Sequence, residues 1–587
     1  MASEAPSWLT PLRDHLGKRV PATATGQALL PFQMEAVQEA LECEGRFILG
    51  HEMGLGKTAM ALAIVAHYQH EWPVLVVAPP VLLEQWSYEI TRWLPKVARS
   101  EVQVIRQATI TRQKNKVKET KPVEIEPSSK FVLVSYSLLV GQNKKVPGHR
   151  WRTTQTNDHL RATSAGGKYK VIIVDEAHAL KAHDSLRTQT LLPMLQDARR
   201  AVLMTGTPMA NSSAADVLPL LQAVAGRSAP RVPFTGWCEY FCAENRQIYT
   251  GFRWLDRWMG VDAEREEELH SLLRLRMARK LKREVMAELP PKQRVCVALE
   301  VTERELKRVR AQQDAVKDLE RAVQGDEDDG VPTHELMRVF KLLAEAKQKA
   351  VCEWLDDALL PPILGGGAGG GKVIIFAHHL SVHGVLHEHL EKQLGSCGGQ
   401  WVHVTGTTPA ADKDKQLAAF RDNPRCRVAL LAVQACGAGL NLNQADTVVF
   451  AELCWTPSTL EQAEARVHRM GQQRSTLVYY LTAGGLDSPD AIMFNALNKK
   501  ADAVARVVDG AEARGALRAA SLQTPKRRPR EAEAAEDDDE GAEAPGAPRA
   551  ERKRKQIELE EDDDDLEQGK KSVVRSLEPA VNAVVVD

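Results

Sequence analysis

The segment HEMGLGKT, residues 51–58, is the most informative part of this chain about function; it lies between the apolar run 47–49 and a helical pattern that follows it. A glycine-bounded loop between a strand and a helix exposes backbone N–H groups at the helix N-terminus, and this concavity suits a polyphosphate. Lys57 is expected to reach the β- and γ-phosphates, and the Thr58 hydroxyl to help hold Mg²⁺. The match to the Walker A pattern is imperfect, because His51 takes the place of its first glycine. The segment therefore predicts a nucleotide site at a strand–helix junction.

Short β-branched runs recur on both sides of this loop. In the first half of the chain they are FILG, VLVVA, FVLVS, VIIVD and AVLMT, at 47–50, 74–78, 131–135, 171–175 and 201–205. After residue 370 the pattern restarts with VIIFA, WVHV, VALLA, TVVFA and LVYYL, at 373–377, 401–404, 428–432, 447–451 and 477–481. Continuous apolar strands that alternate with helices indicate parallel sheets covered on both faces. The sequence predicts an α/β protein with two parallel-sheet lobes of about five strands each.

The rest of the chain differs in composition from these lobes. We divide the chain into an N-terminal segment, a first lobe, a mainly helical insertion, a second lobe, a C-terminal helical brace and a charged tail, at 1–24, 25–225, 226–364, 365–489, 490–525 and 526–587. In the insertion, 306–323 and 336–360 are charged and favour helix. GGGAGGG at 365–371 predicts a flexible joint. Polar stretches at 109–130 and 141–169 predict surface insertions within the first lobe.

The tail from residue 526 contains no Phe, Trp or Tyr. It cannot bury enough apolar surface to fold alone, so we expect it to be disordered. Basic clusters at 526–530 and 552–555 interrupt its acidic runs. They are read either as nuclear import signals or as solvated charges, and the first reading predicts a nuclear protein.

Length and composition limit the class of protein. The 587 residues leave room for about three or four domains. No apolar run approaches the roughly 18–20 residues that span a bilayer, and MASEAPSWLT lacks the layout of a secretory signal, so no membrane is expected. Nine cysteines without a CxxC pair make a zinc module unexpected and favour reduced thiols.

A second motif, VIIVDEAH, ends the fourth predicted strand at 171–178. Asp175 is expected to bind Mg²⁺ through its water shell, and Glu176 to orient and deprotonate the water that attacks the γ-phosphate. TGTP follows at 205–208, at the end of the next strand. The alternative is an ordinary acidic strand end. The Lys-Thr loop upstream and TGTP downstream favour ATP hydrolysis instead.

A third motif, QAEARVHRMGQ at 462–472, lies in the second lobe. Its Gln462, Arg466 and Arg469 would share one face of a helix. Exposed arginines are usually only solvated, but the first-lobe motifs contain no arginine for the transition state of phosphoryl transfer. An arginine finger contributes roughly 10³–10⁵ in rate. Supplied by the other lobe, it makes hydrolysis conditional on closure.

Further motifs complete an ordered set: LLPFQ at 29–33, VLVVAPPVLLEQW at 74–86, and GLNL and ADTVVF at 439–442 and 445–450. Together with the three motifs above and TGTP, they resemble the SWI/SNF-type double-stranded DNA translocases of helicase superfamily 2, over residues 25–510. Within that family, RWLPK, LPPKQR, FAHH and AELCWTP are similar to the HARP-type annealing helicases, which act at stalled replication forks.

The resemblance implies two RecA-like lobes that use ATP and Mg²⁺ to track along double-stranded or forked DNA. It implies that Thr58 and Asp175 hold the metal and that Gln33 meets adenine. The catalytic residues are then Lys57, Asp175, Glu176, Arg466 and Arg469. The ATP-binding residues are Gln33, Met53, Gly54, Leu55, Gly56, Lys57, Thr58 and Gln462. Contacts to the DNA backbone, which carry no sequence information, fall on Pro79, Trp86, Ser135, Tyr136, His378, His379, Gly437, Gly439 and Asn441.

Several functions remain open at this point. The leading hypothesis is a DNA-dependent ATPase that reanneals or remodels forks in DNA repair, with chromatin or replication-fork proteins as further partners. A nucleosome-remodelling ATPase on the same motor is the second. An ATP-gated DNA-binding scaffold with little turnover is a third, from a different class, and an RNA helicase is a weaker fourth.

Overall fold

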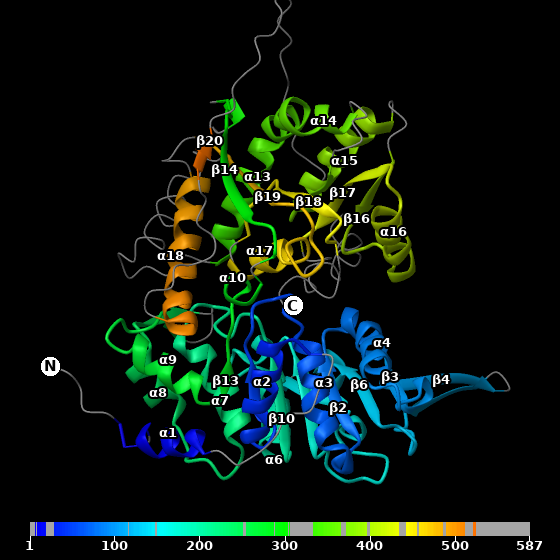
Figure 1. Ribbon diagram of the computed structural model, residues 1–587, viewed down its shortest axis with the longest axis vertical. Coiled ribbons are helices and arrows are strands. Elements are labelled where there is room, and N and C mark those ends of the chain that lie inside the picture. The colour runs from blue at the N-terminus through cyan, green and yellow to red at the C-terminus, as the bar shows by residue number, and fades with distance from the viewer. Residues whose placement is uncertain are drawn as a thin grey trace, which may run out of the picture. The chain divides into compact units, whose positions relative to one another are not determined.

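The computed structural model describes residues 6–7, 9–18, 29–114, 117–146, 149–155, 157–249, 254–286, 288–302, 304–305, 333–364, 371–395, 400–433, 442–454, 457–484, 489–510 and 521–523 (Figure 1). Several predictions lie outside these residues. They concern the charged stretch 306–323, the glycine-rich run 365–370, the loop 434–441 and the tail from 524.

A seven-stranded sheet organises the first lobe, in the order β13-β1-β10-β9-β2-β6-β3. Every neighbouring pair is parallel. The strands are β1 (Arg46–Leu49), β2 (Val74–Ala78), β3 (Val102–Ile105), β6 (Phe131–Ser135), β9 (Val171–Asp175), β10 (Arg200–Met204) and β13 (Met277–Ala278). The five predicted strands are confirmed. The two edge strands, β3 and β13, are additions to the prediction.

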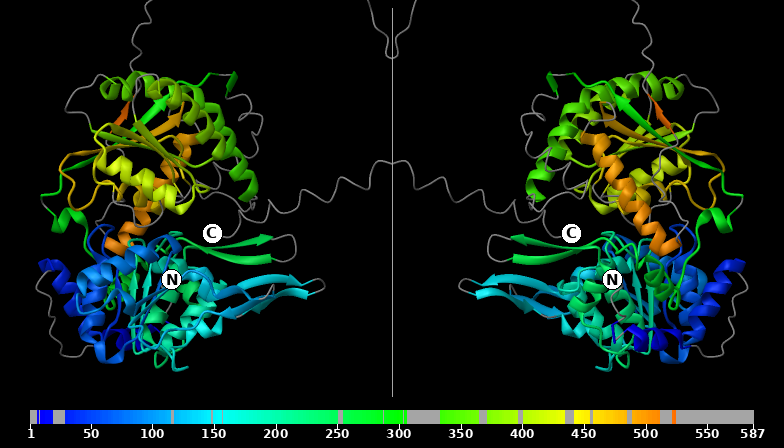
Figure 2. Two further views of the ribbon diagram at one scale, coloured as in Figure 1. Left: turned by 90° about the vertical axis from the view of Figure 1, so that its right-hand side faces the viewer. Right: turned by 90° about the vertical axis from the view of Figure 1, so that its left-hand side faces the viewer.

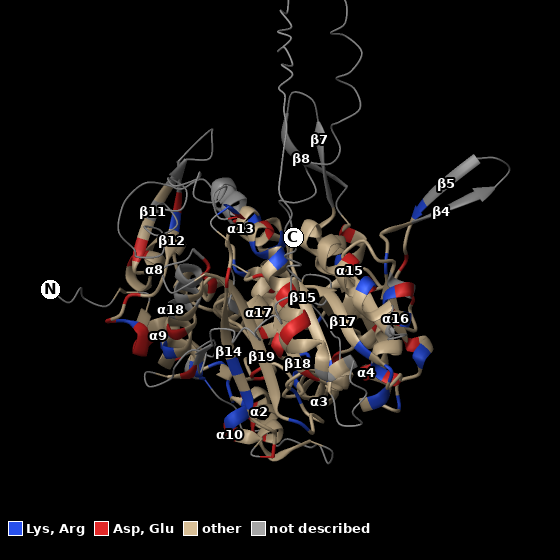
Figure 3. Ribbon diagram, turned by 90° about the horizontal axis from the view of Figure 1, so that it is seen from above, with Lys and Arg blue, Asp and Glu red and all other residues tan. Residues whose placement is uncertain are grey.

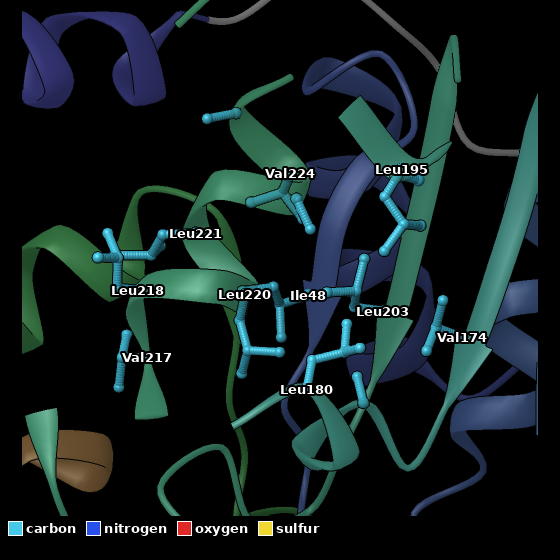
Figure 4. Close-up of a cluster of buried hydrophobic side chains, with 14 of the residues drawn as sticks. Ile48, Val174, Leu180, Leu195, Leu203, Val217, Leu218, Leu220, Leu221 and Val224 are labelled. Atoms are coloured by element: carbon cyan, nitrogen blue, oxygen red, sulfur yellow. The ribbon is translucent and has the colours of Figure 1, made fainter. Parts of the chain in front are cut away.

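Both faces of this sheet are buried. In β1, Phe47 and Leu49 belong to one apolar cluster and Ile48 to another, as the two-residue period of a strand requires. Figure 4 shows Ile48 and Leu203 of the sheet beside Leu220 and other leucines and valines of neighbouring helices. The helices of this lobe are α1 (Leu9–Gly17), α2 (Pro31–Glu42), α3 (Lys57–His67), α4 (Leu83–Trp93), α5 (Tyr136–Val140), α6 (Leu186–Asp197), α7 (Leu218–Ala225), α8 (Phe234–Phe241) and α9 (Glu266–Arg274).

A second parallel sheet organises the other lobe, in the order β16-β17-β15-β18-β19-β14-β20. Its strands are β14 (Lys292–Leu299), β15 (Lys372–Ala377), β16 (Gln400–Val404), β17 (Cys426–Ala432), β18 (Ala445–Phe450), β19 (Thr476–Ala483) and β20 (Ser521–Gln523). The five predicted strands are again present. The helices are α13 (Thr333–Trp354), α14 (Pro361–Leu364), α15 (Leu380–Gly395), α16 (Ala410–Asp422), α17 (Pro457–Glu464) and α18 (Pro489–Asp509).

The segment 226–364 is more than the mainly helical insertion that we expected. It contributes β13 to the edge of the first sheet and β14 to the interior of the second. A short helix, α10 (Lys282–Val285), lies between these two strands. Figure 3 shows Lys and Arg on α10 and at the start of β14. The segment therefore belongs structurally to both lobes.

Antiparallel hairpins extend the first lobe. The polar stretches predicted as surface insertions contain β4 (Thr109–Lys114) with β5 (Val117–Pro122), and β7 (Gln142–Val146) with β8 (His149–Gln155). A further hairpin pairs β11 (Glu244–Tyr249) with β12 (Trp254–Met259). β4 projects from the body of the lobe in Figure 1, and the green hairpin of β11 and β12 does so in Figure 2.

No helix in the described part of the chain combines the length and the apolar character that crossing a membrane requires.

Candidate functional site

The loop of HEMGLGKT turns tightly between β1 and α3. Gly54 and Gly56 have φ values of +87° and +80°, which glycine adopts without strain. A Cβ at Gly56 would clash with Gln33 Nε2, and one at Gly54 would lie 3.2 Å from the Arg469 Cβ. The loop is therefore approached closely by the start of α2 on one side and by the second lobe on the other.

Lys57 opens α3 and points back over this loop. Its Nζ donates hydrogen bonds to the carbonyl oxygens of His51 at 2.8 Å and Glu52 at 3.4 Å. Burial lowers the pKa of Lys57 to about 8, although the carboxylate of Glu176 opposes this shift. The ammonium group is poorly solvated and lies near acidic groups, a setting that favours exchange of these carbonyls for phosphate oxygens.

Asp175 and Glu176 end β9 on the same side of the sheet. Burial, followed by mutual repulsion with Glu176, raises the pKa of Asp175. Burial also raises the pKa of Glu176, while Lys57 and Arg466 act in the opposite direction. Glu176 has a φ of +50°, a conformation that is rare for residues with a side chain and that concentrates at functional sites. A buried carboxylate with a raised pKa is suited to accept a proton from water.

Trp86 and Tyr136 hold this acidic strand end in place. Trp86 Nε1 donates to Asp175 Oδ2 at 2.8 Å, and the Tyr136 hydroxyl donates to the Asp175 carbonyl oxygen at 2.5 Å. The two aromatic residues are only 2% and 5% exposed. Both side chains are thus buried against β9, and the expectation that their segments contact DNA stays a prediction. Their role was not visible in the sequence, since the contacts join residues far apart in the chain.

Ser135 has a structural role in addition to its predicted one. Its Oγ accepts a hydrogen bond from Leu138 N at 3.3 Å and so caps α5, and the residue is buried. An N-cap of this kind stabilises a helix end rather than binding a ligand. All of the DNA-contact candidates stay predictions. Pro79, His378 and His379 are half-buried, whereas Gly437, Gly439 and Asn441 lie outside the described residues.

His178 connects the acidic pair to TGTP. Its Nδ1 lies 3.3 Å from Glu176 Oε2 and 3.3 Å from Thr205 Oγ1. Burial and the nearby Lys181 lower the pKa of His178 to about 4, so the ring is neutral near pH 7. A neutral ring can donate with one nitrogen only. His178 belongs to the DEAH motif, but its spacing alone did not indicate this link to the next strand.

A cavity of about 140 Å³ gathers these groups. Its walls include the loop from Met53 to Thr58, the acidic pair and two arginines of the second lobe: Met53, Gly54, Gly56, Lys57, Thr58, Leu82, Gln85, Trp86, Glu89, Asp175, Glu176, Met204, Ala465, Arg466 and Arg469. Burial, and then the adjacent Arg466, lowers the pKa of Arg469. The structure thus brings together all five predicted catalytic residues.

The two arginines do not lie on a helix as we expected. α17 ends at Glu464, and Arg466 and Arg469 follow in turns. The Arg466 carbonyl oxygen accepts from Leu442 N instead of from the next helical turn. The chain has therefore left the helix before it reaches the two arginines. The prediction of a shared helix face was wrong, although both side chains reach the cavity.

The remaining ATP-binding candidates lie around the cavity rather than in it. The Gln33 Oε1 accepts from Leu30 N at 2.9 Å, and its Nε2 donates to the Leu55 carbonyl oxygen at 3.0 Å. Gln33 therefore ties the start of α2 to the phosphate loop in this structure. Leu55 is fully buried. Gln462, on α17, does not belong to the described cavity wall.

Family models and curated relatives match most of the chain. The model described as "SNF2-related domain" matches residues 32–352, and "Helicase conserved C-terminal domain" matches residues 350–471. The chain is 33% identical over 485 residues to "DNA annealing helicase and endonuclease ZRANB3" of Mus musculus, a match that covers 82% of this chain and 41% of that protein. It is 32% identical over 461 residues to "SWI/SNF-related matrix-associated actin-dependent regulator of chromatin subfamily A-like protein 1" of Xenopus tropicalis, covering 78% of this chain and 43% of that protein.

A solved structure, "Sulfolobus solfataricus SWI2/SNF2 ATPase core in complex with dsDNA", aligns with 84% of this chain and 99% of that chain, at 17% identity and a TM-score of 0.34. The chain spans less than half the length of the two curated relatives. The SNF2-related model by itself spans more than half of the chain and includes the phosphate loop and the acidic pair. The two family models and the mouse relative confirm the resemblance that the motifs indicated. The chain belongs to the SNF2-related family of helicase-type ATPases.

Proposed function

We propose that this protein is an ATP-dependent double-stranded DNA translocase that reanneals or remodels replication forks in the nucleus. One observation carries the proposal. The phosphate loop and acidic pair of the first sheet share a cavity with Arg466 and Arg469 of the second lobe. An ATPase built across two lobes can convert each cycle of closure and opening into movement along a polymer.

The cavity residues fit hydrolysis of a nucleoside triphosphate. Lys57 is placed to bind the β- and γ-phosphates, and the backbone N–H groups of the glycine loop to bind the remaining phosphate oxygens. Glu176 accepts a proton from the attacking water. Arg466 and Arg469 stabilise the charge that spreads over the γ-phosphoryl group in the transition state. No single lobe contains all of these groups, so turnover requires both.

The same cavity fits Mg²⁺. Thr58 and Asp175 both line it, and hydroxyl and carboxylate oxygens are the hard ligands that this ion prefers. When bound, Mg²⁺ neutralises charge on the phosphate oxygens. Two hydrogen bonds fix the orientation of the Asp175 carboxylate. Trp86 Nε1 donates to Oδ2, and Glu176 N donates to Oδ1 at 2.9 Å.

Action on duplex or forked DNA is supported by the relatives. The mouse protein is named an annealing helicase, and the chain matches it over 485 residues. In this chain the surface candidates for the DNA backbone are Pro79 in the first lobe and His378 and His379 in the second. A backbone contact from each lobe would let DNA respond to closure without being read for sequence.

The test is the rate of ATP hydrolysis by the full chain with no nucleic acid, and with single-stranded, duplex, forked and nucleosomal DNA. We expect duplex and forked DNA to stimulate turnover, with forks strongest. Glu176→Gln, prepared in parallel, controls for contaminating ATPases. A rate that no DNA changes would overturn the proposal, and stimulation by RNA alone would favour an RNA helicase.

A nucleosome-remodelling ATPase is the second candidate, because the name of the frog relative refers to chromatin regulation. A strong preference for nucleosomes over naked forked DNA in the same assay would favour it. An ATP-gated scaffold would instead bind DNA in an ATP-dependent way while the wild type and Glu176→Gln hydrolyse equally little.

A further inference from the structure

Arg279 follows β13 and lies outside the nucleotide cavity, next to the loops that form it. Its Nη1 donates to the carbonyl oxygens of Gly50 at 2.7 Å and Gly206 at 2.9 Å. Its Nε forms an ion pair with Asp509 Oδ1 at 2.6 Å. The two charged side chains are 12% and 11% exposed. Burial alone disfavours the charged guanidinium, but the Asp509 carboxylate outweighs this effect and raises the pKa of Arg279.

The two carbonyls belong to the loops that build the ATP site. Gly50 follows the end of β1 and immediately precedes His51, whose carbonyl oxygen accepts from Lys57. Gly206 belongs to TGTP. A Cβ on Gly206 would lie 2.6 Å from Met53 Cγ and 3.5 Å from Lys57 Nζ, so this backbone packs directly on the phosphate loop. One guanidinium therefore fixes the relative position of the two loops that surround Lys57.

Asp509 is the last residue of α18, and this helix is anchored in the first lobe at that end. Arg506 forms an ion pair with Glu266 of α9 at 2.7 Å, and the Val507 carbonyl oxygen lies 2.7 Å from His270 Nδ1. Val507 and Val508 are buried in the apolar cluster of the first lobe. The end of α18 (orange in Figure 1) is thus part of the first lobe's core.

The start of the same helix is anchored in the second lobe. Asp490 Oδ2 accepts from Lys347 Nζ at 2.8 Å and from Ala483 N at 2.7 Å. Lys347 also donates to the Leu481 carbonyl oxygen of β19 at 2.7 Å. The side chains of this buried ion pair are 2% and 4% exposed. Since breaking a buried ion pair is costly, this end of α18 follows the second lobe when that lobe moves.

We propose that Arg279 is a positioning residue of the ATPase site and that its ion pair with Asp509 holds its side chain in place. Through this ion pair, α18 transmits the position of the second lobe to the loops around Lys57. This inference rests on the proposed function. It adds a connection between the lobes that runs behind the phosphate loop, separate from the direct approach of Arg466 and Arg469. When α18 moves, Asp509 moves with it, and the carbonyls of Gly50 and Gly206 lose their shared donor.

The first test uses Asp509→Asn with Arg506→Gln as a matched control. Both substitutions remove an ion pair from the same end of α18, but Arg506 touches neither nucleotide loop. We expect Asp509→Asn to lower the DNA-stimulated kcat about tenfold or more, because small misplacements of catalytic groups are costly, with little change in the KM for ATP. Arg506→Gln should keep kcat within about twofold. Equal losses in the two variants would overturn the inference.

A second variant covers the case in which Asp509→Asn fails to fold. Arg279→Lys keeps the charge beside Asp509 but lacks the planar fork that reaches both carbonyls and the carboxylate at once. We expect the same fall in kcat with an unchanged melting temperature. Wild-type turnover by Arg279→Lys would refute a positioning role.

The third variant acts at the far end of the helix. Asp490→Asn should leave the DNA-independent rate unchanged, because Arg279 keeps its partner, while stimulation by duplex DNA falls several-fold. Full stimulation in Asp490→Asn would show that α18 transmits nothing. If the wild type itself shows no DNA-stimulated hydrolysis, the proposed function fails, and that outcome is distinct from any difference between the variants.

Discussion

Glu464, at the end of α17, is fully buried, and its carboxylate accepts hydrogen bonds from side chains of two strands. Its carboxylate accepts from Lys292 Nζ at 2.7 Å and from Arg294 Nε at 2.8 Å, both on β14, and from the Tyr480 hydroxyl on β19. Nearby cations overcome the effect of burial and hold the pKa of Glu464 well below its usual range. Glu464→Gln would keep the volume but remove the charge.

The loss of folding stability in Glu464→Gln follows from the charged groups that remain around the new side chain. Lys292 and Arg294 would stay charged and poorly solvated, and the Gln amide would present N–H groups towards other donors. Removing one partner of a buried ion pair costs about 3–5 kcal/mol. Because the folded pKa of Glu464 is lowered, its contribution is complete above the unfolded value of 4.5 and is lost as the pH falls through the folded value. The wild type and Glu464→Gln should therefore converge in stability only in acid.

Glu461, on the same helix, is a matched control of opposite sign. Burial, and then the Glu464 carboxylate, raises the pKa of Glu461 to about 7. Its protonated form stabilises the fold below pH 4.5, and this contribution is lost as the pH rises towards about 7. Glu461→Gln should consequently gain stability relative to the wild type over this range, by about 1–3 kcal/mol.

The assay is urea denaturation of both variants and the wild type at pH 5 and pH 8, with hydrogen exchange of β14, β19 and α17 to locate the loss. Faster exchange in these elements should accompany the destabilised Glu464→Gln protein. If Glu464→Gln lies within about 1 kcal/mol of the wild type at pH 8, or Glu461→Gln loses as much, the electrostatic reasoning is refuted.

Three further predictions concern the nucleotide cavity. Lys57→Ala or Glu176→Gln should abolish hydrolysis while DNA binding, measured by fluorescence anisotropy, stays largely intact; turnover in either variant would refute the site assignment. Arg469→Ala should bind ATP within a few-fold of the wild type but lose DNA stimulation, because the arginine acts on the transition state; an equal loss of ATP affinity would place it in ground-state binding. Trp86→Phe should lower kcat about tenfold without weakening DNA binding, since a hydrogen bond to a charged group is worth about 1.5–3 kcal/mol; weaker DNA binding would instead support a DNA contact by Trp86.

The parts of the fold that the sequence predicted are those with a local signal. Buried parallel strands such as β9 read as continuous apolar runs, and all ten strands predicted in this way are present. β13 has only two residues and is defined by its pairing with β1, in which the carbonyl oxygens of Arg276 and Ala278 accept from Ile48 N and Gly50 N. β14 begins with Lys292 and Arg294, charges that are tolerated in a sheet because Glu464 neutralises them.

The residues of the candidate site divide in the same way, into those with a local sequence signal and those whose partners lie far away in the chain. Two short motifs predicted Lys57, Asp175 and Glu176 as site residues, because each motif occupies only a few consecutive residues at one end of a strand. The hydrogen bond from Trp86 to Asp175 was not predicted, because the two residues lie 89 positions apart in the chain. Arg279 escaped notice for a similar reason. Its three partners lie 73, 229 and 230 residues away, and a lone arginine in a basic stretch gives no sign of them.

Residues 277–299 supply β13 to the first sheet and β14 to the second, and this limits where the protein can be cut into two folded halves. A fragment that stops at residue 225 would lack β13 and leave one edge of β1 open, a surface prone to intermolecular pairing. A fragment that starts at residue 365 would lack β14, which bridges β19 and β20. Cuts between Lys280 and Lys292 preserve both sheets. Even then, the amino-terminal half would need the last turn of α18 added in trans, because Val507 and Val508 complete its interior.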